Sequence, residues 1–168
     1  ETIQKDAHHL DETFELLLKH NIPELDSAAH MLITLEKSRR TLHEYILGEA
    51  EARQEFQDSI KEFDEHQDEL KASLNAAAAA AADEIESDLA DLDVIIEKHE
   101  HFHEDGEKMI ALLDAGKKEE AIAFLNAEVD DEIEEMQTLI EAFEEDAERE
   151  IKEWGELVDK DIHEIEEL

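Results

Sequence analysis

The sequence contains no cysteine, a single proline and only four glycines among its 168 residues. Without cysteine no disulfide can form, so disulfide usage says nothing about the redox compartment of the protein. Glycine and proline are the residues that most often mark turns and loops, and their scarcity leaves little room for short strands joined by many turns. A few long helices are therefore the expected architecture.

Basic residues are also scarce. Fifteen lysines and arginines face 51 aspartates and glutamates, which gives a formal net charge of −36 at pH 7. Such a charge repels nucleic acid and anionic lipid surfaces, and it suits a cationic partner or a salty environment. It also serves simply as a solvated, self-repelling surface.

Long hydrophobic runs are missing as well. The longest uncharged stretch, residues 72–82, is mostly alanine, and no segment is long and apolar enough to cross a bilayer or resembles a signal peptide. The sequence begins with Glu1 rather than methionine, so we expect a processed protein or a fragment of a larger one. Its length favours a single domain.

What the sequence does contain is a regular alternation of three- and four-residue steps between apolar positions. This spacing is typical of helices that pack against their neighbours at a shallow angle. The third apolar segment predicts a buried seam made of Ile85, Leu89, Leu92, Ile96, His99, His103, Gly106, Ile110 and Leu113. Two members of that seam are histidines, and polar groups on a buried seam are costly unless they have partners.

The periodicity predicts four helices, at about residues 2–47, 50–75, 83–114 and 117–168. Together they predict an all-α, antiparallel up-down-up-down four-helix bundle with long first and last helices. In such a bundle the long outer pair projects beyond the inner hairpin, and both chain ends emerge at the same pole. This shape suits a domain placed between two membrane-spanning helices.

Few residues have the chemistry needed to bend or end these helices. Pro23 is expected to kink the first helix, because it lacks a hydrogen-bond donor and crowds the preceding turn. Gly48 and Gly116 are expected to end the first and third helices. The reversal between the second and third helices is expected within residues 75–83, where Asn75 and Asp83 flank a run of alanines.

Three stretches of the sequence are similar to a known family. Residues 21–25 and 35–48 resemble the first helix of four-helix-bundle sensor domains, and residues 115–121 resemble the turn into their last helix. These are the extracytoplasmic ligand-binding domains of methyl-accepting chemotaxis receptors and of some sensor histidine kinases. The resemblance implies a homodimer anchored by flanking membrane helices, in which ligand binding near the dimer seam displaces the last helix.

The resemblance also suggests a ligand site on the first helix. In aspartate-type members arginines hold the carboxylate of the ligand, and by position Arg39 resembles one of them while His43 stands where another would be. Arg40 completes a basic pair that could bind a small anion. A further arginine of the pattern falls near Leu35, which is not basic, so the resemblance does not carry over an amino-acid ligand. The expected ligand is a small molecule or a cation.

A second candidate site lies on the third helix. His99 and His103 are four residues apart, so both imidazoles project from one face, as in a mononuclear site for Zn, Ni or Cu. Glu100 and His103 form a Glu-x-x-His pair, but a di-iron site needs two such pairs and only one is present. Further ligands would come from Glu97, His101 or, on the facing helix, His66.

These residues have other interpretations. Arg39 can simply pair with a carboxylate on the seam, and His99, Arg39 and Gln67 can form a polar layer that fixes helix register. Histidines near carboxylates also titrate within the physiological range, which would make the bundle respond to pH.

No nucleophile–base pair, glycine-rich phosphate loop or dinucleotide motif is present, so we expect no enzymatic activity and no required cofactor. The sequence thus favours a receptor sensor domain. A metal-binding or pH-responsive bundle and a structural coiled-coil spacer are the alternatives.

Overall fold

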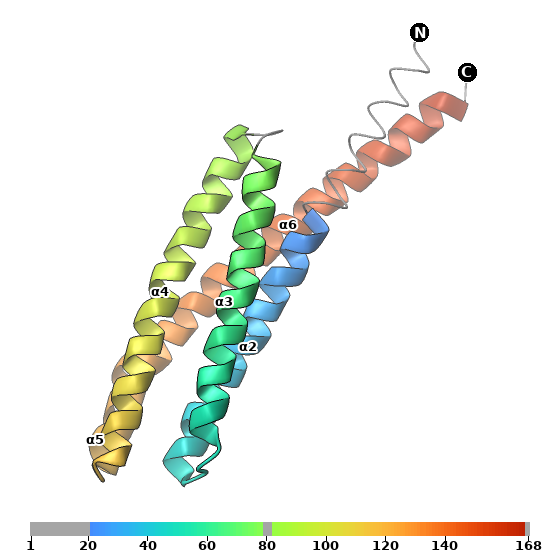
Figure 1. Ribbon diagram of the computed structural model, residues 1–168. Helices are drawn as coiled ribbons and strands as arrows, with labels where there is room; N and C mark the ends of the chain where they lie inside the picture. Colours follow the sequence, from blue (N-terminus) through green and yellow to red (C-terminus); the bar gives the residue numbers. More distant parts are fainter. Residues whose placement is uncertain (1–20, 79–81, 167–168) are drawn as a thin grey trace.

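The computed structural model describes residues 21–78 and 82–166, and every secondary-structure element within these ranges is helical. The elements are α2 (Ile22–Leu47), α3 (Ala52–Ala77), α4 (Ala82–Asp114), α5 (Lys118–Phe124), the π-helical segment η2 (Leu125–Val129) and α6 (Asp130–Glu166). Because α5, η2 and α6 follow one another directly, they form one rod. The protein is an antiparallel four-helix bundle, as the sequence predicts (Figure 1).

The helix ends lie close to their predicted positions. Gly48 and Gly116 adopt left-handed backbone conformations, with φ of 97° and 75°, and each ends a helix as expected. Glycine takes this conformation without steric cost, and the N–H of Gly116 donates to the carbonyl of Leu113 at 2.9 Å. α3 ends at Ala77 and α4 begins at Ala82, and both positions lie within the range predicted for the reversal.

The start of α2 lies at the edge of the described residues, so only part of the helix predicted over residues 2–47 can be compared with the structure. Pro23 lies in the first turn of α2, where its missing N–H leaves no helical hydrogen bond unmade. Asn21 still has a right-handed helical backbone, with φ of −62° and ψ of −37°. Residues 2–20 lie outside the described part, so the kink at Pro23 remains a prediction.

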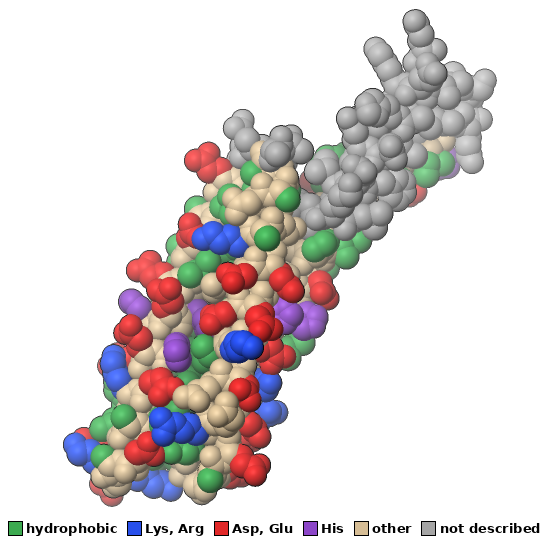
Figure 2. Space-filling view, in the orientation of Figure 1, with side chains coloured by type: hydrophobic (Ala, Val, Ile, Leu, Met, Phe, Trp, Pro, Cys, Tyr) green, Lys and Arg blue, Asp and Glu red, His purple; other side chains and the backbone are tan. Residues whose placement is uncertain are grey.

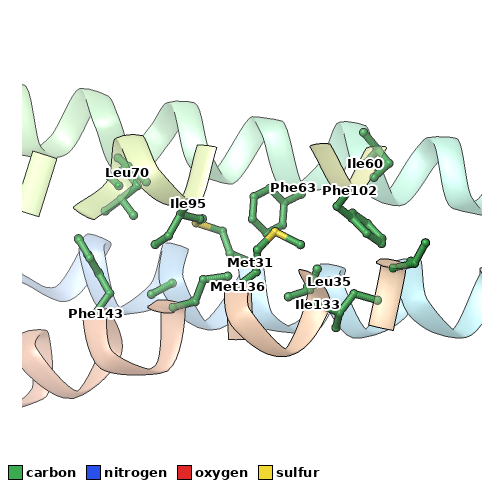
Figure 3. Packing of buried hydrophobic residues seen from close by; sticks show 14 of the residues in the cluster. Met31, Leu35, Ile60, Phe63, Leu70, Ile95, Phe102, Ile133, Met136 and Phe143 are labelled. Carbon is green, nitrogen blue, oxygen red and sulfur yellow. The ribbon is translucent and has the colours of Figure 1, made fainter. Parts of the chain in front are cut away.

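All four rods contribute to one continuous hydrophobic core. Figure 3 shows aromatic and aliphatic side chains from α2, α3, α4 and α6 meeting along the bundle axis. Phe63 and Phe102 lie at its centre, and both are fully buried. Val129, Ile133 and Met136 of the last rod are also buried and continue this core.

The seam of α4 is shifted from the predicted one. Ile95 and Phe102 are buried, whereas Ile96 is only partly buried and His103 is exposed. His99 is buried as predicted. The apolar stripe of α4 is wider than the contact seam, so neighbouring positions compete for the core. Phe102 enters it in preference to His103 because a phenyl ring loses no hydration on burial.

Small polar residues line the contact between α2 and α3. Thr34, Ser38 and Thr41 are buried on α2, and the hydroxyl of Ser38 lies 2.8 Å from that of Ser59 on α3. Each of the three α2 hydroxyls also donates to a backbone carbonyl one turn earlier in its own helix, so none is left unpaired. Small side chains allow close approach, and α2 packs more extensively on α3 than on any other helix.

The π-helical segment η2 has an explanation in the sequence. Ala121, Leu125, Val129 and Ile133 are all buried and are separated by four residues each. An α-helix has 3.6 residues per turn, so three such steps would move the side chain about 120° around the axis. A π-helical turn contains one more residue and absorbs this drift. The segment therefore keeps all four side chains facing the core.

The last rod is the longest, and α6 extends past the α3–α4 hairpin at the end of the bundle where α2 begins (Figure 1). At that end the Asn21 side chain donates a hydrogen bond to Glu150 of α6, with Nδ2 and Oε2 2.7 Å apart. Among the described helices, none combines the length and the apolar content needed to cross a membrane.

Candidate functional site

Two of the three predicted ligand-binding residues converge on one carboxylate. Arg39 and His43 are one turn apart on α2, so both face the start of α6. The Arg39 Nε lies 3.2 Å from Oδ1 of Asp130, and the His43 Nε2 lies 4.0 Å from the same oxygen. These three side chains, which we call the Arg39–Asp130 site, join the first and last of the described rods.

The position of Asp130 depends on the π-helical segment. Asp130 is the first residue of α6 and directly follows η2, whose extra residue sets the direction in which Asp130 points. Its side chain is only 21% exposed. Although Arg39 is within ion-pair distance, Oδ1 of Asp130 accepts no hydrogen bond from any residue in the described ranges. The contact is therefore electrostatic and is not fixed by an aligned hydrogen bond.

Arg40 lies outside this site. Its Nε is 3.5 Å from Oε1 of Glu44 on the same helix, and the side chain is 64% exposed. Adjacent residues of a helix point in directions about 100° apart, so Arg39 and Arg40 cannot both face α6. The sequence-predicted basic pair is thus divided between the α2–α6 contact and the solvent.

The predicted metal ligands of α4 also separate. His99 is buried and stacks on Phe63, with ring centroids 3.8 Å apart, and its Nδ1 lies 3.2 Å from Oδ1 of Asp64. The Nε2 of His99 has no hydrogen-bond partner among the described residues. Glu100 and His103, by contrast, are exposed. His99 is therefore a buried polar residue whose partners, Phe63 and Asp64, both come from α3.

His66, the predicted ligand from the facing helix, lies elsewhere. It stacks on His30 of α2, whereas His99 stacks on Phe63. Within residues 21–78 and 82–166 no three histidine, aspartate or glutamate side chains are grouped as a metal site requires. The structure thus does not bring the four predicted ligands together into one site. Metal binding by His99, His103, Glu100 and His66 stays a prediction.

An acidic cavity of about 170 Å³ lies between α2, α4 and α6. Glu24, which is only 3% exposed, contributes a carboxyl group to its wall. Burial, together with the smaller effect of the charges of Asp88, Glu150 and Asp146, raises the pKa of Glu24 to about 8. At neutral pH this carboxyl group is therefore mostly protonated, unlike the carboxylates at the surface.

Sequence reasoning missed both Glu24 and Asp130. A signal for Glu24 exists: Glu24, Ala28, Met31 and Leu35 follow the four- and three-residue steps of the α2 seam, and all four are buried. Asp130 gives no comparable signal, because its contact with Arg39 depends on how two distant helices align.

The surface around these sites is strongly acidic. Figure 2 shows carboxylate side chains spread over the whole described face, with few lysines and arginines between them and several histidines near the middle. This distribution attracts cations over much of the surface and does not by itself mark one site.

No protein-family model, curated protein or solved structure matches this chain. Functional inference therefore depends on the fold and on the geometry of its sites.

Proposed function

We propose that this chain is the extracytoplasmic ligand-sensing domain of a transmembrane receptor, either a chemotaxis receptor or a sensor kinase. In this proposal the domain binds a small molecule and has no catalytic role. The bound state is transmitted by a shift of α6 relative to α2. Dimerisation and flanking membrane helices belong to the proposal through the resemblance of the sequence to sensor domains.

The Arg39–Asp130 site is the observation that carries this proposal. There Arg39 and His43 of α2 face a carboxylate of α6, and Arg39 and Asp130 are 33% and 21% exposed. A ligand carboxylate could replace Asp130 opposite Arg39 and His43 and form aligned, charge-assisted hydrogen bonds with them. Such an exchange would release the start of α6 from α2.

Two further features support a signalling role. The π-helical segment η2 precedes Asp130 directly, and single π-helical turns within α-helices are frequently found at functional sites. In addition, α6 continues as one helix from Asp130 to Glu166, so a displacement at Asp130 is carried to the end where α2 begins.

Thermal unfolding of the full chain with a panel of organic acids, amino acids and amines tests the proposal. A carboxylate ligand at about 100 times its Kd should stabilise the fold by about 2.7 kcal/mol, which raises Tm by roughly 5–11 °C. The double variant Arg39→Gln/His43→Gln should lose this rise.

Arg149→Gln is the matched control, because Arg149 pairs with Asp146 of its own helix and is far from Asp130 in the sequence. It should retain the full rise in Tm. The binding part of the proposal is wrong if no carboxylate raises Tm, or if the double variant responds as the wild type does. The receptor part requires hydrophobic helices flanking this segment in the gene product.

A further inference from the structure

Two histidines face each other across the α2–α3 contact. His30 of α2 and His66 of α3 stack with ring centroids 4.6 Å apart and an interplanar angle of 26°. Their side chains are 44% and 22% exposed, so solvent reaches both rings. This pair is separate from the Arg39–Asp130 site and from His99.

The partners of Nδ1 fix the tautomer of His30. Its Nδ1 lies 2.8 Å from the backbone carbonyl oxygen of Asp26. A carbonyl oxygen only accepts hydrogen bonds, so Nδ1 carries the proton, and Nε2 of the neutral ring keeps its lone pair.

In His66 the oxygen near Nδ1 belongs to a side chain. Its Nδ1 lies 3.4 Å from Oε2 of Glu69, which is an ion-pair distance without a hydrogen bond. Each imidazole therefore has an oxygen close to Nδ1, hydrogen-bonded in His30 and at ion-pair distance in His66, and Nε2 is the nitrogen available to a metal ion. Metal-binding histidines in proteins commonly show this arrangement, in which an oxygen partner orients the ring and makes the free nitrogen more basic.

The separation of the two rings suits a shared metal ion. With metal–nitrogen distances of about 2.0–2.1 Å, the centroids of two imidazoles bound to one ion lie roughly 4.5–5 Å apart. The observed 4.6 Å falls in this range. The rings need to turn from stacking towards a common point, but the two helices need not move apart.

We propose that His30 and His66 bind one divalent transition-metal ion, of the Zn²⁺, Ni²⁺ or Cu²⁺ class, through their Nε2 atoms. Imidazole nitrogen is a preferred ligand of these metals. Because no third histidine, aspartate or glutamate in the described ranges joins the pair, water fills the remaining positions. The acidic surface raises the local concentration of cations, and the bound ion links α2 to α3.

Titration of the full chain with Zn²⁺ and with Ni²⁺ by calorimetry tests this site. Excess Mg²⁺, which prefers oxygen ligands, should be present to occupy surface carboxylates. One site should be measured in the wild type. His30→Gln and His66→Gln should each weaken its affinity at least tenfold, because a single imidazole then remains. His163→Gln, which changes an exposed histidine of α6, should leave the affinity unchanged.

Histidine side-chain NMR spectra with Zn²⁺ provide a second measurement that needs no variant. The signals of His30 and His66 should shift together at the first equivalent of metal. Unchanged affinity in both variants, or a first equivalent that shifts other histidines instead, overturns the proposal. Circular dichroism of each variant should show the helical content of the wild type, so that a loss of metal binding is not caused by unfolding.

Discussion

Phe56 of α3 occupies the space that a side chain at Gly106 of α4 would need. A Cβ atom placed on Gly106 would lie 2.4 Å from Cζ of the Phe56 ring. Phe56 is fully buried, and its ring packs edge-on against Phe102 at a centroid distance of 5.9 Å. The absence of a side chain in the middle of α4 thus lets a large aromatic ring enter the core.

Gly106→Ala should therefore destabilise the protein, although alanine is the better helix former. Overpacking of a core costs about 1–3 kcal/mol, and the gain in helix propensity of about 1 kcal/mol offsets part of it. We expect a fall in Tm of a few degrees in thermal unfolding followed by circular dichroism.

Gly155→Ala is the matched control for this prediction. Gly155 lies in α6 with no atom within 4 Å of an added Cβ, so only helix propensity changes. Its Tm should rise slightly. Equal shifts in the two variants would contradict a steric role for Gly106.

Deletion of Ala127 should be tolerated. It shortens η2 by one exposed residue and changes the four-four-four spacing from Ala121 to Ile133 into four-three-four, which a plain α-helix can accommodate. Helical content should be kept, and the free energy of unfolding should change by roughly 1 kcal/mol or less, as for most surface changes.

Deletion of Ala142, an exposed alanine within the regular part of α6, is the matched comparison, because no extra residue is present there. It rotates every later residue by about 100°, so Phe143 and Ala147 leave the core. Losing the burial of one phenylalanine alone costs about 1.5–3 kcal/mol, so unfolding in denaturant should begin much earlier. If both deletions destabilised the protein equally, the interpretation that η2 contains one residue more than a regular α-helix would be wrong.

Glu24 should make the bundle less stable as the pH rises. Its pKa is about 8 in the folded state against 4.5 for the free group, so the folded state binds more protons between these values. Its contribution to the free energy of unfolding is therefore fully present below about pH 4.5 and is lost as the pH rises through 8. The total is on the order of 5 kcal/mol.

Glu24→Gln should flatten this dependence, because glutamine stays neutral across the whole range. Glu36→Gln, an exposed change on the same helix, removes the same formal charge and should leave the slope as in the wild type. Denaturation at constant ionic strength from pH 5 to 9 measures the three slopes. Parallel slopes for wild type and Glu24→Gln would show that this carboxyl group is not buried in its neutral form.

The architecture was predictable because periodicity, glycine positions and alanine content all pointed to four helices. It was harder to predict which residues of each helix face the core. Where two apolar residues are adjacent, as at Met31–Leu32 and Ile95–Ile96, the sequence allows either to face the core, and packing buries Met31 and Ile95.

The candidate site was predicted only in part. The resemblance to sensor domains pointed to Arg39 and His43, and in the structure both lie near the same carboxylate. Their partner Asp130 depends on the alignment of two helices and on η2, neither of which leaves a local pattern that identifies it. His30 likewise reaches His66 only through the register of α2 on α3.

Because α6 is long, a small change in its tilt corresponds to a large displacement of its far end. With 37 residues and a rise of 1.5 Å per residue, the helix is about 55 Å long. A tilt of about 5° pivoting at Asp130 would swing the opposite tip by about 5 Å, close to one helical pitch. Motion too small to disturb the core near Asp130 is thereby magnified at the far tip.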